Sequence, residues 1–183
     1  MQLRFSPMIG GHPSYVAYDM AVCKAKPAHS RPPHDKCHCG FNAWHEREVA
    51  LEYHNEIVRH EESSQLEYGA KTSIRSTALL RVRLSGDVVE APLNAMNLNK
   101  WGYRASRQLV TDVFFDVKCY LCDNEATGLG ITRKAYDLRQ APRGTMLRPV
   151  RPTCRKHEVR IILPPQALMK YNDVGIHLGL PSE

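Results

Sequence analysis

Four residues in the C-terminal half of the chain have the types and spacing of a zinc site. Two residues separate Cys119 from Cys122 and two separate Cys154 from His157, with 31 residues between the pairs. Such spacing lets both side chains of one tight turn reach a single ion, and two turns complete the tetrahedral shell that zinc prefers. We expect a structural zinc ion, because four protein ligands leave no open position. The alternative is two unrelated cysteine turns with His157 at the surface.

Three further cysteines lie in a histidine-rich part of the N-terminal region. Alternate residues of an extended strand face the same way, so Cys37 and Cys39 can share a metal ion, and Cys23 would add a third ligand. His34 precedes Cys37 by three residues, which is a ligand spacing, and His29 is the other candidate. These residues predict a second zinc site. The alternative is three buried thiols that pack as small hydrophobic groups.

Catalytic uses of these residues have less support. A zinc deaminase needs a histidine and two cysteines on the metal and a glutamate that moves protons, and the segment 60–62 together with Cys119 and Cys122 offers those types. Cys154 and His157 would, however, close the coordination shell that a catalytic zinc leaves open. A redox role is disfavoured by the acidic residues after Cys122. A zinc-knuckle nuclease needs histidines around the knuckle, and positions 61–156 hold none. We expect a protein without enzymatic activity.

The formal charge of +6 is unevenly distributed. Between residues 133 and 160, nine basic and two acidic residues give +7, whereas seven glutamates and two arginines between residues 45 and 68 give −5. A basic loop held at both ends by zinc would attract a polyanion. One alternative is that these basic residues form a solvated surface. The other is that the acidic segment 46–62 folds back onto them and neutralises their charge. The candidate nucleic-acid-binding residues are Arg133, Lys134, Arg139, Arg143, Arg148 and Arg151.

The other hypothesis for function is a protein-binding module, such as a phage factor that acts on a host protein. Its contact surface would be the acidic segment or the aromatic residues Trp44 and Trp101. The expected partners are therefore nucleic acid, an acidic protein surface or a host protein. No stretch approaches the roughly 20 apolar residues of a membrane helix, and residues 1–10 lack the pattern of a signal peptide. We expect a cytoplasmic protein, in which cysteine clusters more often bind metal than form disulfides.

Periodicity outlines the elements that must position these residues. Apolar residues recur with helical spacing between Trp44 and Tyr68, which predicts an acidic helix. Alternation predicts a strand, a turn or bulge at Gly86-Asp87 and a second strand within 77–90, and another strand from 103 to 117. We expect 91–102 to be a loop, 119–157 to be loops and short strands, 159–163 a strand and 166–171 a short helix.

The predicted fold is α+β, a small antiparallel sheet with short helices that one or two structural zinc sites stabilise. Residues 1–117 would hold the N-terminal Cys/His element, the acidic helix and the small sheet. Residues 118–183 would hold the zinc-knuckle segment with its basic insert and a C-terminal helix.

Three motifs resemble those of a family of small uncharacterised proteins from actinobacteria and their phages. They are Cys37-His-Cys-Gly-Phe-Asn-Ala43, preceded by His29 and Pro32-Pro33-His34, then Gly86-Asp-Val-Val-Glu90 and Gly102-Tyr-Arg-Ala105. The match covers residues 20–115 with gaps. The chain departs from the pattern in its longer acidic helix and in residues 91–101, which separate two strands that are usually close. The resemblance implies a shared fold and carries no activity with it.

Overall fold

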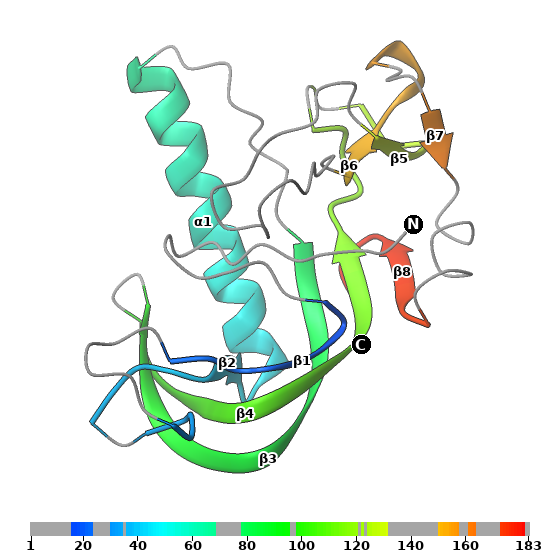
Figure 1. Ribbon diagram of the computed structural model, residues 1–183. Coiled ribbons are helices and arrows are strands. Elements are labelled where there is room, and N and C mark those ends of the chain that lie inside the picture. The colour runs from blue at the N-terminus through cyan, green and yellow to red at the C-terminus, as the bar shows by residue number, and fades with distance from the viewer. Residues whose placement is uncertain are drawn as a thin grey trace.

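The computed structural model describes residues 16–23, 30–34, 36–68, 78–95, 98–120, 122, 124–131, 150–157, 161–163 and 173–181. Within them, one long helix packs against a five-stranded sheet, and a three-stranded sheet lies beyond one end of the larger one (Figure 1). Among the described strands, β4 and β8 pair in parallel and all other pairs are antiparallel. The prediction of an α+β fold built on antiparallel sheet is confirmed.

The larger sheet is organised around a long curved hairpin (Figure 1). Its strands β3 (Ala78–Ala95) and β4 (Leu98–Phe115) pair over their whole length. The register shifts between Ser85 and Val88, where Gly86 has a φ of +75° and a Cβ would collide with the Ser106 hydroxyl. The bulge expected at Gly86-Asp87 is therefore present, and the strand continues through it.

The expectation of a loop over residues 91–102 is wrong. β3 runs to Ala95 and β4 begins at Leu98, so this segment forms the far end of the hairpin. Pro92 and the neighbouring asparagines have weak strand propensity, but the register of the hairpin overrides it. β3 pairs only with β4 among the described residues, and a proline that lacks an N–H is tolerated in such an edge strand.

Three short strands lie end to end along the other edge of β4. β2 (Phe41–Trp44) pairs with residues 102–105, β1 (Tyr18–Met20) with 107–109, and β8 (Gly175–Leu178) runs parallel to 112–115. The N-terminal region and the C-terminal segment therefore dock on the same strand.

Helix α1 (Arg47–Tyr68) contacts β2 and β3 and rises from the concave side of the hairpin (Figure 1). It buries Val49, His54 and Ile57, which lie on one face at helical spacing. The helix begins three residues later than the sequence pattern predicts, because Trp44 belongs to β2 and packs edge-on against Tyr53, with ring centroids 5.7 Å apart. Within the described residues, no helix has both the length and the apolar character that crossing a membrane requires.

The smaller sheet has the strand order β6-β5-β7 and comprises β5 (Gly128–Ile131), β6 (Val150–Thr153) and β7 (Ile161–Leu163). Leu129 of β5 is fully buried and belongs to the same hydrophobic core as Val110, Val113, Phe115, Val174 and Ile176. β7 falls within the strand predicted for 159–163, whereas the helix predicted for 166–171 lies outside the described residues. The domain boundary predicted at residue 117 stays a prediction, and the core connects residues on both sides of it.

Candidate metal centres

The structure brings together all four residues of the predicted C-terminal site. The ligand atoms of Cys119, Cys122, Cys154 and His157 lie within 4.8 Å of one another. Nδ1 of His157 is 3.6 Å from Sγ of Cys119 and 3.5 Å from Sγ of Cys154, and the Sγ atoms of Cys122 and Cys154 are 3.7 Å apart. A zinc tetrahedron with Zn–S of about 2.3 Å and Zn–N of about 2.0–2.1 Å has S–S edges of about 3.8 Å and S–N edges of about 3.5–3.6 Å. The described donor atoms therefore match the shell of one zinc-sized ion.

Two tight turns supply these donors. The amide of Cys122 donates to the carbonyl of Cys119 at 3.4 Å, and the amide of His157 donates to the carbonyl of Cys154 at 3.0 Å across the short 3-10 helix η1 (Arg155–His157). The amide of Tyr120 donates to the carbonyl of Pro152 in β6 at 2.9 Å, which fixes the first turn beside the strand that leads into the second. These backbone hydrogen bonds place the two ligands of each pair on one turn.

The thiols of this site differ in acidity. Burial would raise the pKa of Cys154, but the amide of Lys156, together with Cys119, His157 and Cys122, lowers it to about 6. At Cys122 the amide of Asn124 favours the thiolate, yet burial and the neighbouring thiols outweigh it and raise the pKa. The thiolate that a metal requires is therefore favoured at Cys154 near neutral pH.

The N-terminal cluster contains three of the predicted ligands. The Sγ atoms of Cys23, Cys37 and Cys39 lie within 4.8 Å of one another, and those of Cys23 and Cys37 are 3.8 Å apart, the edge expected of a zinc tetrahedron. The ring of His34 is not in this group, and its Nδ1 accepts a hydrogen bond from the amide of Lys36 at 3.2 Å. The alternative fourth ligand, His29, lies outside the described residues and stays a prediction.

The backbone of His34 contributes to this cluster although its ring does not. Its amide hydrogen-bonds to Cys39, and its carbonyl accepts from the amide of Cys37 at 3.1 Å. Burial nevertheless dominates, and with the neighbouring thiols of Cys37 and Cys23 it raises the pKa of Cys39 to about 11. None of the six cysteines forms a disulfide. The three thiols are therefore reduced, and Cys39 stays protonated at neutral pH unless a cation favours its thiolate.

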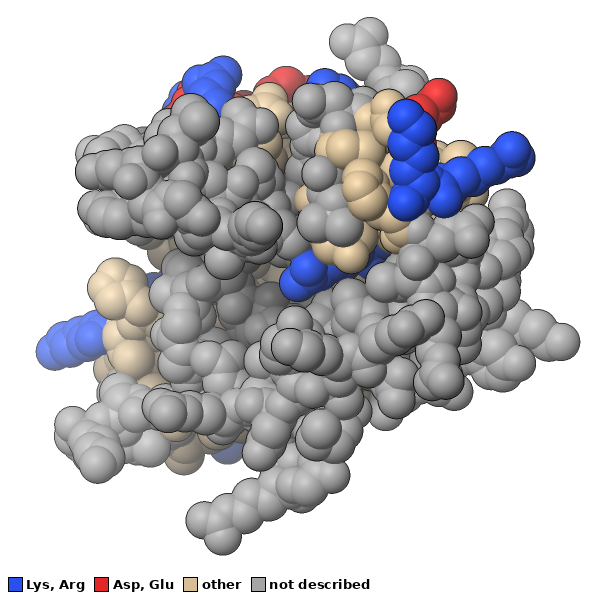
Figure 2. All heavy atoms as spheres, turned by 90° about the horizontal axis from the view of Figure 1, so that it is seen from above, with Lys and Arg blue, Asp and Glu red and all other residues tan. Residues whose placement is uncertain are grey.

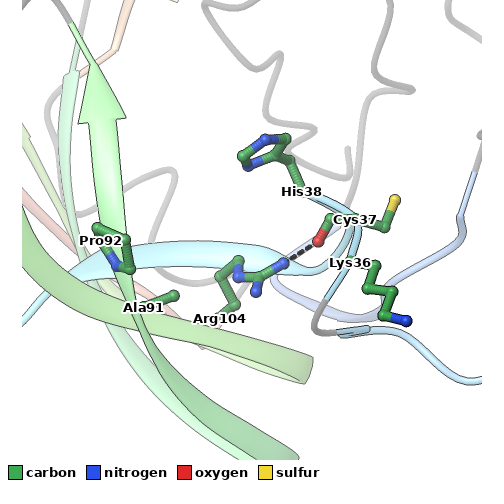
Figure 3. Close-up of a pocket in the computed structure, with 6 residues that line it drawn as sticks. All are labelled: Lys36, Cys37, His38, Ala91, Pro92 and Arg104. Atoms are coloured by element: carbon green, nitrogen blue, oxygen red, sulfur yellow. Dashed lines mark hydrogen bonds between the residues drawn. The ribbon is translucent and has the colours of Figure 1, made fainter.

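Arg104 of β4 holds the loop that carries His34 and Cys37. The sequence pattern did not predict this role. Only 7% of Arg104 is exposed, and its Nη1 donates to the carbonyls of Cys37 and of His34, the latter at 3.1 Å (Figure 3). Gly40 has a φ of +115°, and a Cβ there would lie 3.1 Å from Cβ of Pro33 and 3.2 Å from the carbonyl of Ala105. The loop therefore lies directly against β4.

A cavity of about 310 Å³ adjoins this contact, lined by Lys36, Cys37, His38, Ala91, Pro92 and Arg104. Figure 3 shows the guanidinium of Arg104 between the β3 residues and the loop that carries Cys37. None of the lining residues is acidic. A charged residue so deeply buried is costly unless it is hydrogen-bonded, and the two carbonyls meet part of that requirement.

The three motifs of the family resemblance lie side by side in the sheet. Ala43 of β2 and Glu90 of β3 both pair with Tyr103 of β4, and Phe41 and Val88 both pair with Ala105. The signal that could have identified Arg104 was its place in the Gly102–Ala105 motif. Arg104 contacts Cys37, which lies 67 residues earlier in the chain, so local residue spacing could not predict this contact.

The predicted basic surface is only partly within the described residues. Arg151 is half-buried in β6 and places its guanidinium over the ring of Tyr120 at 5.2 Å, and the other five candidates, at 133–148, lie outside the described residues. Lys118, Arg155 and Lys156 are exposed on the ligand-bearing turns. On the face that Figure 2 shows, basic atoms cover more of the coloured surface than acidic ones.

Of the two aromatic residues proposed as a protein contact, only one is exposed. Trp101 is 62% exposed near the far end of the hairpin, whereas Trp44 is half-buried against α1. No family model, no curated protein and no solved structure matches this chain.

Proposed function

We propose that this protein is a zinc-stabilised, non-enzymatic protein that binds nucleic acid through basic side chains on and next to its C-terminal zinc knuckle. The observation that carries the proposal is the closed, partly buried four-donor group with cations on its turns. Cys119 is fully buried and Cys154 is nearly so. A catalytic zinc keeps one position open to water or substrate, and four protein donors at tetrahedral spacing leave none.

Zinc is the metal that the donor set favours. Thiolates and imidazole at tetrahedral spacing suit zinc, whereas magnesium and calcium prefer oxygen ligands. We expect two zinc ions per chain, one at each cysteine cluster. Elemental analysis of the purified protein measures this directly, and fewer than one tightly bound metal per chain would contradict the proposal.

Three exposed cations lie within one residue of a zinc ligand in the chain. Lys118 precedes Cys119, and Arg155 and Lys156 lie between Cys154 and His157. A folded metal site would thus hold their backbone in one conformation, and Arg155 and Lys156 belong to the segment 133–160 with its net charge of +7. Basic groups that neutralise phosphates release counterions, so nucleic-acid affinity would fall steeply with salt.

Fluorescence anisotropy with labelled DNA and RNA between 50 and 300 mM salt tests this proposal. The double variant Arg155→Ala/Lys156→Ala removes two charges and no ligand atom. We expect the slope of log K against log salt to fall by about 1.4 on single strands and 1.8 on duplex DNA. The matched control is Arg59→Ala, which removes an exposed arginine of α1. Equal slopes for wild type and the double variant, at unchanged zinc content, would refute the assignment of these residues.

The exposure of Trp101 supports one competing function, a protein-binding module. Tryptophan at the centre of a protein interface often contributes much of the binding energy. That reading predicts a partner protein that is retained independently of salt and released by Trp101→Ala. The nucleic-acid proposal predicts instead that Trp101→Ala leaves the binding of DNA and RNA unchanged.

A further inference from the structure

One face of the larger sheet is exposed where β1, β4 and β3 run side by side. Paired residues on adjacent strands share a face, so Tyr18, Leu109 and Arg83 form one row across the sheet. The next row on the same face lies two residues away along each strand and consists of Met20, Arg107 and Ser85. The row between them, which includes the 3% exposed Gln108, points to the opposite face. We call these two exposed rows, with the adjoining Arg81, the platform.

The platform is positively charged. Arg83 and Arg107 are both exposed, and Arg81 precedes Arg83 by two residues on the same strand. The carboxylate of Asp112 lies 3.4 Å from Nη1 of Arg81 and 3.0 Å from Nε2 of His177, so this acid is engaged at the end of the platform. Among the described residues of the two rows, the cations that a ligand could contact are therefore Arg83 and Arg107.

The platform also exposes apolar side chains to an unusual degree. Tyr18 is 55% exposed and Met20 is 57% exposed, and the adjacent Val22 is 69% exposed. Leu109 lies between Tyr18 and Arg83 in the first row and is partly exposed. An aromatic ring and aliphatic groups beside arginines are what a stacked base and its phosphates require.

We infer that the platform binds single-stranded nucleic acid, with Tyr18 stacking on a base and Arg83 and Arg107 contacting phosphates. This inference rests on the proposed function and adds a second surface to it. A single strand is favoured over a duplex because a tyrosine ring on a sheet face stacks only on a base that is unpaired. A second copy of this chain is disfavoured as occupant, because a symmetric contact would bring the arginines of both copies together.

Binding to a labelled oligothymidine of 15 nucleotides, and to a duplex of the same length, tests the inference. Stacking contributes about 1–3 kcal/mol per base, so we expect Tyr18→Ala to weaken single-strand binding by about 5- to 150-fold. Tyr18→Phe keeps the ring and should bind within about twofold of wild type. Arg83→Ala/Arg107→Ala should lower the salt slope on single strands by about 1.4. Trp101→Ala, an exposed aromatic residue elsewhere, is the matched control.

The outcomes separate this inference from the proposed function. If only the knuckle variant Arg155→Ala/Lys156→Ala weakens binding, the platform inference is wrong and the proposed function stands. If only the platform variants weaken binding, the knuckle assignment fails instead. The inference would be overturned if Tyr18→Ala weakened duplex and single-strand binding equally. It would also be overturned if Tyr18 were needed to bind a protein and not the oligonucleotide. Circular dichroism and zinc content establish that each variant is folded.

Discussion

The two cysteine clusters achieve metal-ligand spacing in different ways. At the C-terminal cluster, two short turns bring four donors together, and local amides with the neighbouring side chains lower the pKa of Cys154 to about 6. At the N-terminal cluster, three thiols from a longer segment meet, and burial raises the pKa of Cys39 to about 11. The first cluster is prepared for a cation by its own turns. The second depends on Arg104, a residue of the central strand.

The surroundings of the clusters differ as much as their chemistry. The N-terminal loop leads directly into β2, which pairs with β4 in the larger sheet. The C-terminal turns flank a sheet of three short strands, with four, four and three residues. Short strands bury little apolar surface, so a metal ion bound there would supply more of the folding free energy. Loss of the C-terminal ion should therefore be the more damaging.

The largest effect is expected from Cys154→Ser. The substitution removes a buried ligand, and we expect one zinc ion per chain to be lost and the melting temperature to fall by at least about 10 °C, corresponding to about 4 kcal/mol. Hydrogen exchange should show β5 and β6 losing protection while β3 and β4 keep theirs. Cys39→Ser, the matched change at the other cluster, should cause a smaller loss of stability. Equal losses for both variants would remove the distinction between the clusters.

An intermediate effect is expected from Arg104→Met, which keeps the length of the side chain and removes its donors. The carbonyls of His34 and Cys37 lose their charged partner, at a cost of about 1.5–3 kcal/mol. Hydrogen-bond partners of this kind orient the groups that bind a metal. In competition with a chelator, we therefore expect the N-terminal site to bind zinc with about 10- to 100-fold lower affinity.

Arg83→Met is the control for Arg104→Met, since it alters an exposed arginine on the same hairpin. The C-terminal site should keep its zinc in both variants. A chelator titration that finds two unchanged sites in Arg104→Met would show that the loop does not need this contact.

The smallest effect is expected from Asp112→Asn, which tests the attachment of β8 to β4. The hydrogen bond with His177, with help from Thr111 and Arg81, lowers the pKa of Asp112 below its usual value despite partial burial. A lowered pKa in the folded state stabilises the protein above the unfolded value of about 3.9, and this contribution disappears as the pH falls through the folded value. At pH 7 we expect a loss of about 0.5–1 kcal/mol, or about 1–3 °C.

Melting curves at pH 7 measure this difference with His177 in place and again in a His177→Ala background, where it should become much smaller. Glu90→Gln changes an exposed carboxylate on the neighbouring strand and should leave stability unchanged in both backgrounds. An equal loss for Asp112→Asn with and without His177 would assign its effect to packing.

Much of the candidate site could be predicted because its determinants are local. The pairs Cys119-Cys122 and Cys154-His157 each lie within one turn, so spacing alone identified the donors. The helix was recognisable from the recurrence of apolar residues, and the bulge from Gly86. The segment 91–102 was misassigned because its composition resembles a loop while its conformation is set by pairing with the partner strand. The parallel docking of β8 has no local signal either.

The sequence by itself determined which atoms can serve as metal ligands, where the helix lies and how the charge is divided along the chain. These follow from residue type and from periods of two to four residues. The tertiary structure decided that Arg104 binds the loop of Cys37, that Leu129 shares a core with β4, and that Tyr18, Arg83 and Arg107 meet on one face. Each of these depends on strand register between segments that are distant in the chain, and register is a property of the assembled sheet.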